Sequence, residues 1–113
     1  MDVERVASVI PVDDLATAVE VWARLLGVPP TFVDGDRWAQ FDVAGGRIAL
    51  AGADRAHDSP GLLVKVADVD RARADALAAG LYVGEVTDGP HERRCVVTAP
   101  DRCPVVFYTP TAG

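Results

Sequence analysis

The stretch Ile10–Gly27, IPVDDLATAVEVWARLLG, decides the fold because it returns in a weaker form at Leu63–Gly80, LVKVADVDRARADALAAG. In each copy an apolar run ends in the pattern Val-x-Asp-(Leu/Val), and an amphipathic segment follows that stops at a glycine. A repeat of this length within one chain predicts two halves of similar architecture. The sequence is therefore interpreted as two related modules rather than as one unbroken pattern.

The first half predicts the order β-α-β-β-β. Val3–Val12 is a β-rich run with little polar interruption, typical of a buried strand, and Asp13 or Asp14 is expected to cap the helix that follows. Gly27 suits the left-handed position after the last helical turn. The apolar stripe at helical spacing consists of Leu15, Ala18, Val19, Trp22, Leu25 and Leu26. Strands are then expected at Thr31–Asp34, Arg37–Val43 and Arg47–Ala51.

The second half predicts the same order after a linker at residues 53–60. Leu62–Val66 is its first strand, and Asp68 or Asp70 is expected to cap a helix that ends at Gly80. The apolar face of this helix is expected to hold Val69, Ala72, Ala76 and Leu77. Strands are then expected at Tyr82–Thr87, Arg93–Ala99 and Pro104–Thr109. The predicted class is α+β, in a single domain spanning residues 1–113, with repeats of about 1–52 and 61–113.

Composition excludes several classes of partner. The 113 residues carry a net charge of -6, whereas nucleic acids and anionic membrane surfaces require clustered Lys and Arg. No apolar run approaches the roughly 20 residues of a membrane span, and the start MDVERVASV is acidic where a signal peptide would be basic. A cytoplasmic location is predicted. Cys95 and Cys103 lack the spacing of a metal pair and are expected to be reduced and structural.

The strands predict which side chains can meet a ligand, because successive residues of a strand face opposite sides. On the last strand of each half, Ile48 with Leu50 and Val105 with Phe107 suit the helix side. A cleft on the other side would hold Trp38, Gln40, Lys65 and Tyr108. Aromatic surface with a few polar groups is the composition that small-molecule sites prefer. The alternative is that these residues coat a solvent face or a dimer interface.

Four segments carry a resemblance to a known family. They are IPVDDLATAVEVWARLLGV, WAQFDVAGGRIALAG, VKVADVDRARADALAAG and APDRCPVVFYTP, in this order along nearly the whole chain. With the internal repeat, they resemble the vicinal oxygen chelate superfamily, also called the glyoxalase, bleomycin resistance and extradiol dioxygenase family. The resemblance implies a pair of βαβββ modules whose mixed sheets curl around a cleft, usually in a homodimer.

The resemblance also locates the positions at which the metal enzymes of this superfamily carry their ligands. Here these positions are Ala7, Ala49, Gly61 and Val106. None has a donor side chain for a divalent cation, so neither a metal nor another cofactor is expected. This departure argues against glyoxalase I, dioxygenase, epimerase and metal-dependent antibiotic-modifying activities.

Three residues are candidates for metal-free chemistry. His91 beside Glu92 is a possible general base, and Lys65 could polarise a carbonyl or enolate. The alternative is that His91 is a solvated residue at a hairpin tip. A displaced metal site would need His57 and Asp58 in the linker to converge with this pair. Of Arg93 and Arg94, at most one is expected to reach the cleft, because adjacent strand residues face opposite sides.

The leading hypothesis is a metal-independent small-molecule-binding protein similar to the bleomycin-resistance type, which sequesters an aromatic or amphipathic ligand and thereby confers antibiotic resistance. The expected partners are the ligand and a second copy of the chain. The predicted ligand-binding residues are Ala7, Trp38, Gln40, Arg47, Lys65, Val106 and Tyr108. The alternative is a metal-free lyase, isomerase or cyclase that uses His91, Glu92 or Lys65 for proton transfer.

Overall fold

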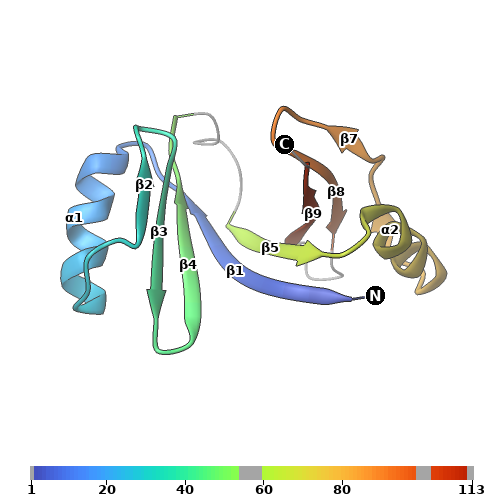
Figure 1. Ribbon diagram of the computed structural model, residues 1–113, viewed down its shortest axis with the longest axis horizontal. Coiled ribbons are helices and arrows are strands. Elements are labelled where there is room, and N and C mark those ends of the chain that lie inside the picture. Colours follow the sequence, from blue (N-terminus) through green and yellow to red (C-terminus); the bar gives the residue numbers. More distant parts are fainter. Residues whose placement is uncertain (1, 54–59, 99–102, 112–113) are drawn as a thin grey trace. The chain divides into compact units, whose positions relative to one another are not determined.

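The computed structural model describes residues 2–53, 60–98 and 103–111. The chain divides into two compact units, which are described separately below. The N-terminal unit is Ala7–Pro60, and the C-terminal unit is Gly61–Gly113 together with Met1–Val6. The division falls inside strand β1 (Val3–Pro11), which contributes to both units (Figure 1). Neither of the two helices in the described residues is long and apolar enough to cross a membrane.

The N-terminal unit has the predicted β-α-β-β-β order. After β1 come helix α1 (Leu15–Leu26) and the strands β2 (Phe32–Asp34), β3 (Trp38–Val43) and β4 (Gly46–Ala51). The strand order is β2-β3-β4-β1, with antiparallel pairing from β2 to β4 and parallel pairing between β1 and β4. Helix α1 lies against one face of these strands (Figure 1).

Helix α1 begins and ends where the sequence indicates. Of the two candidate caps the structure uses Asp14, which accepts hydrogen bonds from the Thr17 backbone N–H at 3.1 Å and the Thr17 hydroxyl at 2.9 Å. These bonds hold the pKa of Asp14 below its usual value. Gly27 ends the helix with a φ of 74°, and its N–H donates to the Ala23 carbonyl at 2.9 Å.

The core of the N-terminal unit lies between α1 and the sheet. Its fully buried members are Leu15, Ala39, Phe41 and Leu50, with Trp22 and Leu26 packed against them. The sequence-based expectation for Leu25 is wrong, because this side chain is 69% exposed. Leu25 precedes Leu26 by one residue and therefore points about 100° around the helix from it. Whether a side chain at the margin of an apolar stripe is buried depends on how far the sheet extends beneath it.

The C-terminal unit repeats the order with one change. Its elements are β5 (Gly61–Val66), α2 (Val69–Ala78), β6 (Tyr82–Val83), β7 (Thr87–Asp88), β8 (Glu92–Thr98) and β9 (Pro104–Pro110). β5 runs parallel to β9, and β8 is antiparallel to β9, β6 and β7. The single strand expected at Tyr82–Thr87 is therefore two short strands. Between them the Gly84 carbonyl accepts a hydrogen bond from Arg73 Nε of α2 at 2.9 Å.

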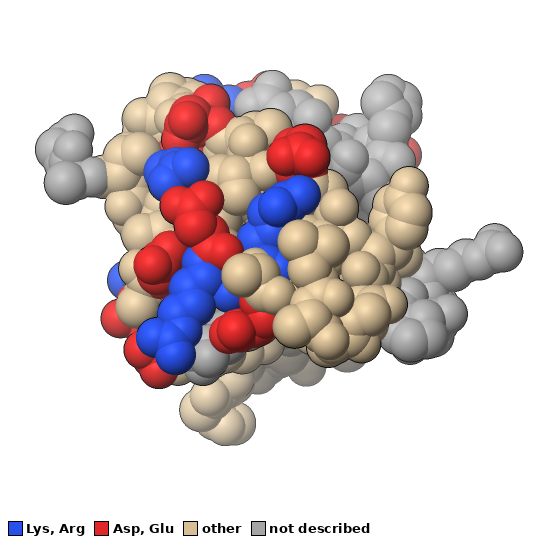
Figure 2. All heavy atoms as spheres, turned by 90° about the vertical axis from the view of Figure 1, so that its right-hand side faces the viewer, with Lys and Arg blue, Asp and Glu red and all other residues tan. Residues whose placement is uncertain are grey.

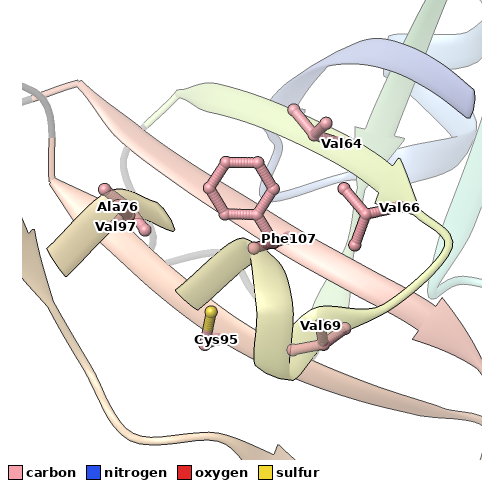
Figure 3. Close-up of a cluster of buried hydrophobic side chains, with 8 residues drawn as sticks. Val64, Val66, Val69, Ala76, Cys95, Val97 and Phe107 are labelled. Carbon is pink, nitrogen blue, oxygen red and sulfur yellow. The ribbon is translucent and has the colours of Figure 1, made fainter. Parts of the chain in front are cut away.

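The core of the C-terminal unit lies beneath α2, which Asp68 caps by accepting from the Arg71 N–H at 3.2 Å. The buried side chains are Val64, Val66, Val69, Ala72, Ala76, Cys95, Val97 and Phe107 (Figure 3). Leu77 does not join them as expected and is 48% exposed. It follows Ala76 by one residue and so points about 100° away from the core side of the helix.

Ion pairs cover part of the surface of the C-terminal unit. Arg93 contacts Asp70 of α2 at 2.9 Å and Asp88 of β7 at 2.8 Å. Arg73 contacts Glu85 at 3.3 Å. Basic and acidic side chains alternate across the face shown in Figure 2. Because the carboxylate of each pair is largely exposed, with 61–88% of its side-chain surface accessible, these pairs contribute little to stability.

Candidate functional site

Each unit has an open face, defined here as the sheet surface opposite its helix. In the N-terminal unit, Ala39 and Phe41 face α1, so the residues that alternate with them on β3 face the open side. Strand pairing arranges this face in rows, which are Trp38–Ala51–Pro11, Phe32–Gln40–Ala49–Val9 and Asp42–Arg47. The structure therefore brings the predicted residues Trp38, Gln40 and Arg47 together on one surface.

Asp42 organises the polar part of the N-terminal open face. Its carboxylate accepts from Arg47 Nε at 2.6 Å through one oxygen and from Gln40 Nε2 at 3.2 Å through the other. Its backbone N–H donates to the Thr31 hydroxyl at 3.0 Å. The hydrogen bond from Arg47, the largest of several causes, holds the pKa of Asp42 below its usual value.

The N-terminal open face can hold a flat, partly polar molecule. Trp38 is half-buried and Phe32 is 54% exposed, and aromatic rings of this kind supply large contact areas with little conformational freedom to lose. Asp42 holds Arg47 and Gln40 in place through hydrogen bonds, and polar groups that are fixed in advance lower the entropic cost of binding. Sequence reasoning missed Asp42 as the residue that positions the other two.

The open face of the C-terminal unit carries a different set of groups. Its rows are Lys65–Tyr108–Arg94–Thr87 and Leu63–Val106–Val96. The predicted residues Lys65, Val106 and Tyr108 thus lie on three neighbouring positions of two strands, and all are half-buried. The residues predicted to bind a ligand therefore divide into two sets, one on each unit.

Arg94 is the member of the Arg93–Arg94 pair that lies on this face. As expected, only one of the two adjacent arginines lies there, since Arg93 points to the helix side and pairs with Asp70. The signal that distinguishes them is the apolar alternation of Cys95 and Val97 in ERRCVVT, both of which are buried. Because Cys95 faces the core, Arg94 must face the open side.

The three candidate catalytic residues do not form one cluster. Glu92 lies two residues before Arg94 on β8 and so shares the open face with Lys65 of β5. His91 is exposed in the turn before β8, where its carbonyl accepts from the Thr111 N–H at 3.0 Å. His57 and Asp58, considered for a displaced metal site, lie outside the described residues.

The four positions that correspond to metal ligands do not fit a divalent cation. Ala7 and Ala49 are buried, with 4% and 0% of their surface exposed. A Cβ atom at Gly61 would stand 2.4 Å from the Pro104 carbonyl oxygen, so the backbone leaves no room there for a ligating side chain. Among the described residues no group of three His, Cys, Asp or Glu side chains could hold a metal elsewhere.

Solved structures of other proteins share this architecture. One, described as an NAD-dependent benzaldehyde dehydrogenase from Legionella pneumophila, matches with a TM-score of 0.83 and 17% identity over 94% of this chain and 99% of its own. A glyoxalase/bleomycin resistance protein/dioxygenase superfamily member from Vibrio splendidus matches with a TM-score of 0.67 and 16% identity over 93% and 97%. Methylmalonyl-CoA epimerase from Mycobacterium tuberculosis matches with a TM-score of 0.61 and 18% identity over 98% and 89%.

These similarities establish the fold and nothing finer, because identities of 16–18% leave the site residues free to differ. No protein-family profile matches the sequence, and no curated protein is significantly similar to it. The Vibrio protein is itself described as a member of the glyoxalase/bleomycin resistance/dioxygenase superfamily. The chain therefore has the fold of the vicinal oxygen chelate superfamily, which its sequence resembles.

Proposed function

We propose that the protein binds an aromatic or amphipathic small molecule on its open faces and sequesters it without a metal ion. The observation that carries this proposal is the presence of a half-buried aromatic side chain on each open face, Trp38 in one unit and Tyr108 in the other. Each unit already has a complete core on its helix side. Aromatic side chains on the opposite face are not part of these cores and can contribute contact area to a ligand.

Metal independence is supported by the chemistry of the four ligand positions, at which Ala7, Ala49, Gly61 and Val106 offer no donor atom. Binding would then depend on apolar contact and a few hydrogen bonds. The proposal includes the sequence-based expectations of a homodimer and of a cytoplasmic location. A role in antibiotic resistance of the bleomycin type would follow if the sequestered molecule is a drug.

Fluorescence of Trp38 tests the proposal. The chain has two tryptophans, and Trp22 packs against the core on the helix side. In a Trp22→Phe variant, Trp38 alone reports on the open face of the N-terminal unit. Titration with a panel of planar aromatic compounds is expected to give saturable quenching for at least one of them, with the compound recovered unchanged.

Bound ligand is also expected to stabilise the fold, by about 2.7 kcal/mol at a free concentration of a hundred times Kd. The matched control is Trp38→Phe in the otherwise native chain, in which Trp22 should not respond to the same compound. A panel that produces neither saturable quenching nor a higher midpoint of thermal unfolding would count against sequestration.

A second candidate function is a metal-free lyase or isomerase. The observation in its favour is that Lys65 and Glu92, a cation and a carboxylate, share the open face of the C-terminal unit. Such a pair can transfer protons when a substrate lies between its members. Conversion of a bound compound that is lost in Lys65→Met, with binding retained, would favour this function. Arg71→Met, which removes a positive charge from helix α2 instead, is the matched variant that should leave turnover intact.

A further inference from the structure

We infer that the open face of the C-terminal unit recognises a carboxylate group on a ligand with an apolar body. This inference rests on the proposed small-molecule binding and adds the chemical class of the ligand. The net charge alone would not predict an anionic ligand, because a protein with a net charge of -6 is expected to repel anions at long range. It depends instead on three neighbouring side chains, Lys65, Tyr108 and Arg94.

Strand pairing brings the two cations within reach of one anion. Lys65 pairs with Tyr108, and Tyr108 pairs with Arg94, so the three side chains form one row across β5, β9 and β8. Adjacent strands lie about 4.8 Å apart, which puts the Cα atoms of Lys65 and Arg94 roughly 10 Å from each other. Both side chains are long enough to converge on one carboxylate above the Tyr108 ring.

The charges of this row are weakly compensated. Within the described part of the chain, Lys65 has no ion pair or side-chain hydrogen bond. The one ionic partner of Arg94 there is Glu92, with Nη1 and Oε1 3.8 Å apart, which is too long for a hydrogen bond. The donors of the guanidinium therefore stay available, and a planar carboxylate can accept two of them at once.

Arginines on the helix side of the same unit, Arg93 on β8 and Arg73 on α2, behave differently. Arg93 contacts two carboxylates at 2.8 and 2.9 Å, and Arg73 contacts the Gly84 carbonyl and Glu85. Those side chains brace α2, β7 and the segment after β6, and the face in Figure 2 shows the resulting mixture of charges. Among the residues that the structure describes, Lys65 and Arg94 have no such bracing, and this difference points to an external anion.

The row beside these cations supplies the apolar half of the site. Leu63, Val106 and Val96 pair across the same three strands and are half-buried. Successive rows on one face are about 6.7 Å apart, a distance that a bicyclic aromatic ring system and its attached carboxylate together span. A molecule with its ring on this row would therefore place its carboxylate at Lys65 and Arg94.

The test compares 2-naphthoate with 2-naphthamide, which share ring and shape but differ in charge. Binding to the native chain is followed by amide chemical shifts in two-dimensional NMR at constant ionic strength. Naphthoate is expected to bind about tenfold more tightly and to shift amides of β5, β8 and β9, since hydrogen bonds between charged groups contribute more than neutral ones. Lys65→Met and Arg94→Met should each reduce naphthoate binding about fivefold to tenfold and leave naphthamide binding unchanged.

Arg71→Met is the matched control, because it removes the same charge from the same unit but from helix α2. Equal affinity for the two probes would overturn the inference, and so would a loss in Arg71→Met as large as that in Arg94→Met. Lys65→Gln and Arg94→Gln replace the methionine variants if those fail to give native spectra. Trp38 fluorescence reads the other unit, so the proposed function can stand there even if naphthoate shifts no amide of the C-terminal unit.

Discussion

The two units follow the same chain order and cover their helix sides in the same way, yet their open faces differ in chemistry. Rows at the same distance along the chain from the helix caps Asp14 and Asp68 are equivalent and can be compared directly. The row Pro11–Ala51–Trp38 in the N-terminal unit corresponds to Lys65–Tyr108–Arg94 in the C-terminal unit. The helix side must fill a closed volume, whereas the open side buries only small side chains such as Ala49 and Ala51 and can carry binding groups elsewhere.

The cores show that the need to fill this volume does not determine which apolar residue occupies each position. The equivalent pairs are Phe41–Ile48 and Val97–Val105, then Ala39–Leu50 and Cys95–Phe107. The aromatic residue lies on β3 in the N-terminal unit and on β9 in the C-terminal unit. Total apolar volume is what packing requires, and it can be divided between partners in more than one way.

The largest expected effect tests whether side chains on the helix side contribute more to the stability of the fold than side chains on the open side. Phe41→Ala should lower the free energy of unfolding by about 3–5 kcal/mol, because Phe41 is completely buried. Phe32→Ala in the same unit is the matched control, since Phe32 is 54% exposed on the open face, and it should cost less than about 1 kcal/mol. Urea denaturation measures both. Similar losses for the two variants would contradict the assignment of faces.

A smaller effect is expected where the two copies differ at the start of their repeats. Gly61→Ala should destabilise the fold by about 1–3 kcal/mol, because the new methyl group would collide with Pro104. The equivalent position in the other copy is Ala7, and Ala7→Gly should cost only about 0.5–1 kcal/mol. Thermal unfolding of the two variants compares them. A silent Gly61→Ala would mean that this strand can move away from β9.

The helix caps sharpen the comparison further. Asp68→Ala should cost about 1 kcal/mol, and Asp14→Ala should cost more, because Asp14 also accepts from the Thr17 hydroxyl. The pKa of Asp14 is lowered in the folded state, so its contribution is complete above the unfolded pKa of about 3.9 and is lost as the pH falls through the lower folded value. The stability difference between the native chain and Asp14→Ala should therefore shrink below about pH 4.

The smallest effect concerns the polar cluster that the N-terminal open face has and the equivalent row of the other unit lacks. Arg47→Met should raise the pKa of Asp42 toward its usual value, because Arg47 is the main cause of its lowering. Arg37→Met, which breaks the exposed pair with Asp34, should leave Asp42 unchanged. Carbon-13 NMR of the side-chain carboxyl follows both titrations. An unmoved Asp42 in Arg47→Met would show that Gln40 and Thr31 suffice.

Local sequence signals located most helices and strands, but they did not predict which side chains at the edges of the helical apolar stripes are exposed. The cap at Asp14 and the stop at Gly27 depend on hydrogen bonds within a few residues of the chain, and such interactions can be inferred from residue types alone. Leu25 and Leu77 were expected in the cores and are exposed. Both lie at the edge of a helical stripe, where burial depends on the width of the sheet beneath.

The sequence by itself determined the repeat, the βαβββ order and the alternation that separates helix side from open side, because each of these follows from periodicity along one segment. It also shows that Ala7, Ala49, Gly61 and Val106 carry no donor side chain. Only the tertiary structure decided which side chains become neighbours across strands, such as Arg94 beside Tyr108 and Asp42 beside Arg47. The register that makes them neighbours is set by packing of the whole sheet, and no single segment encodes it.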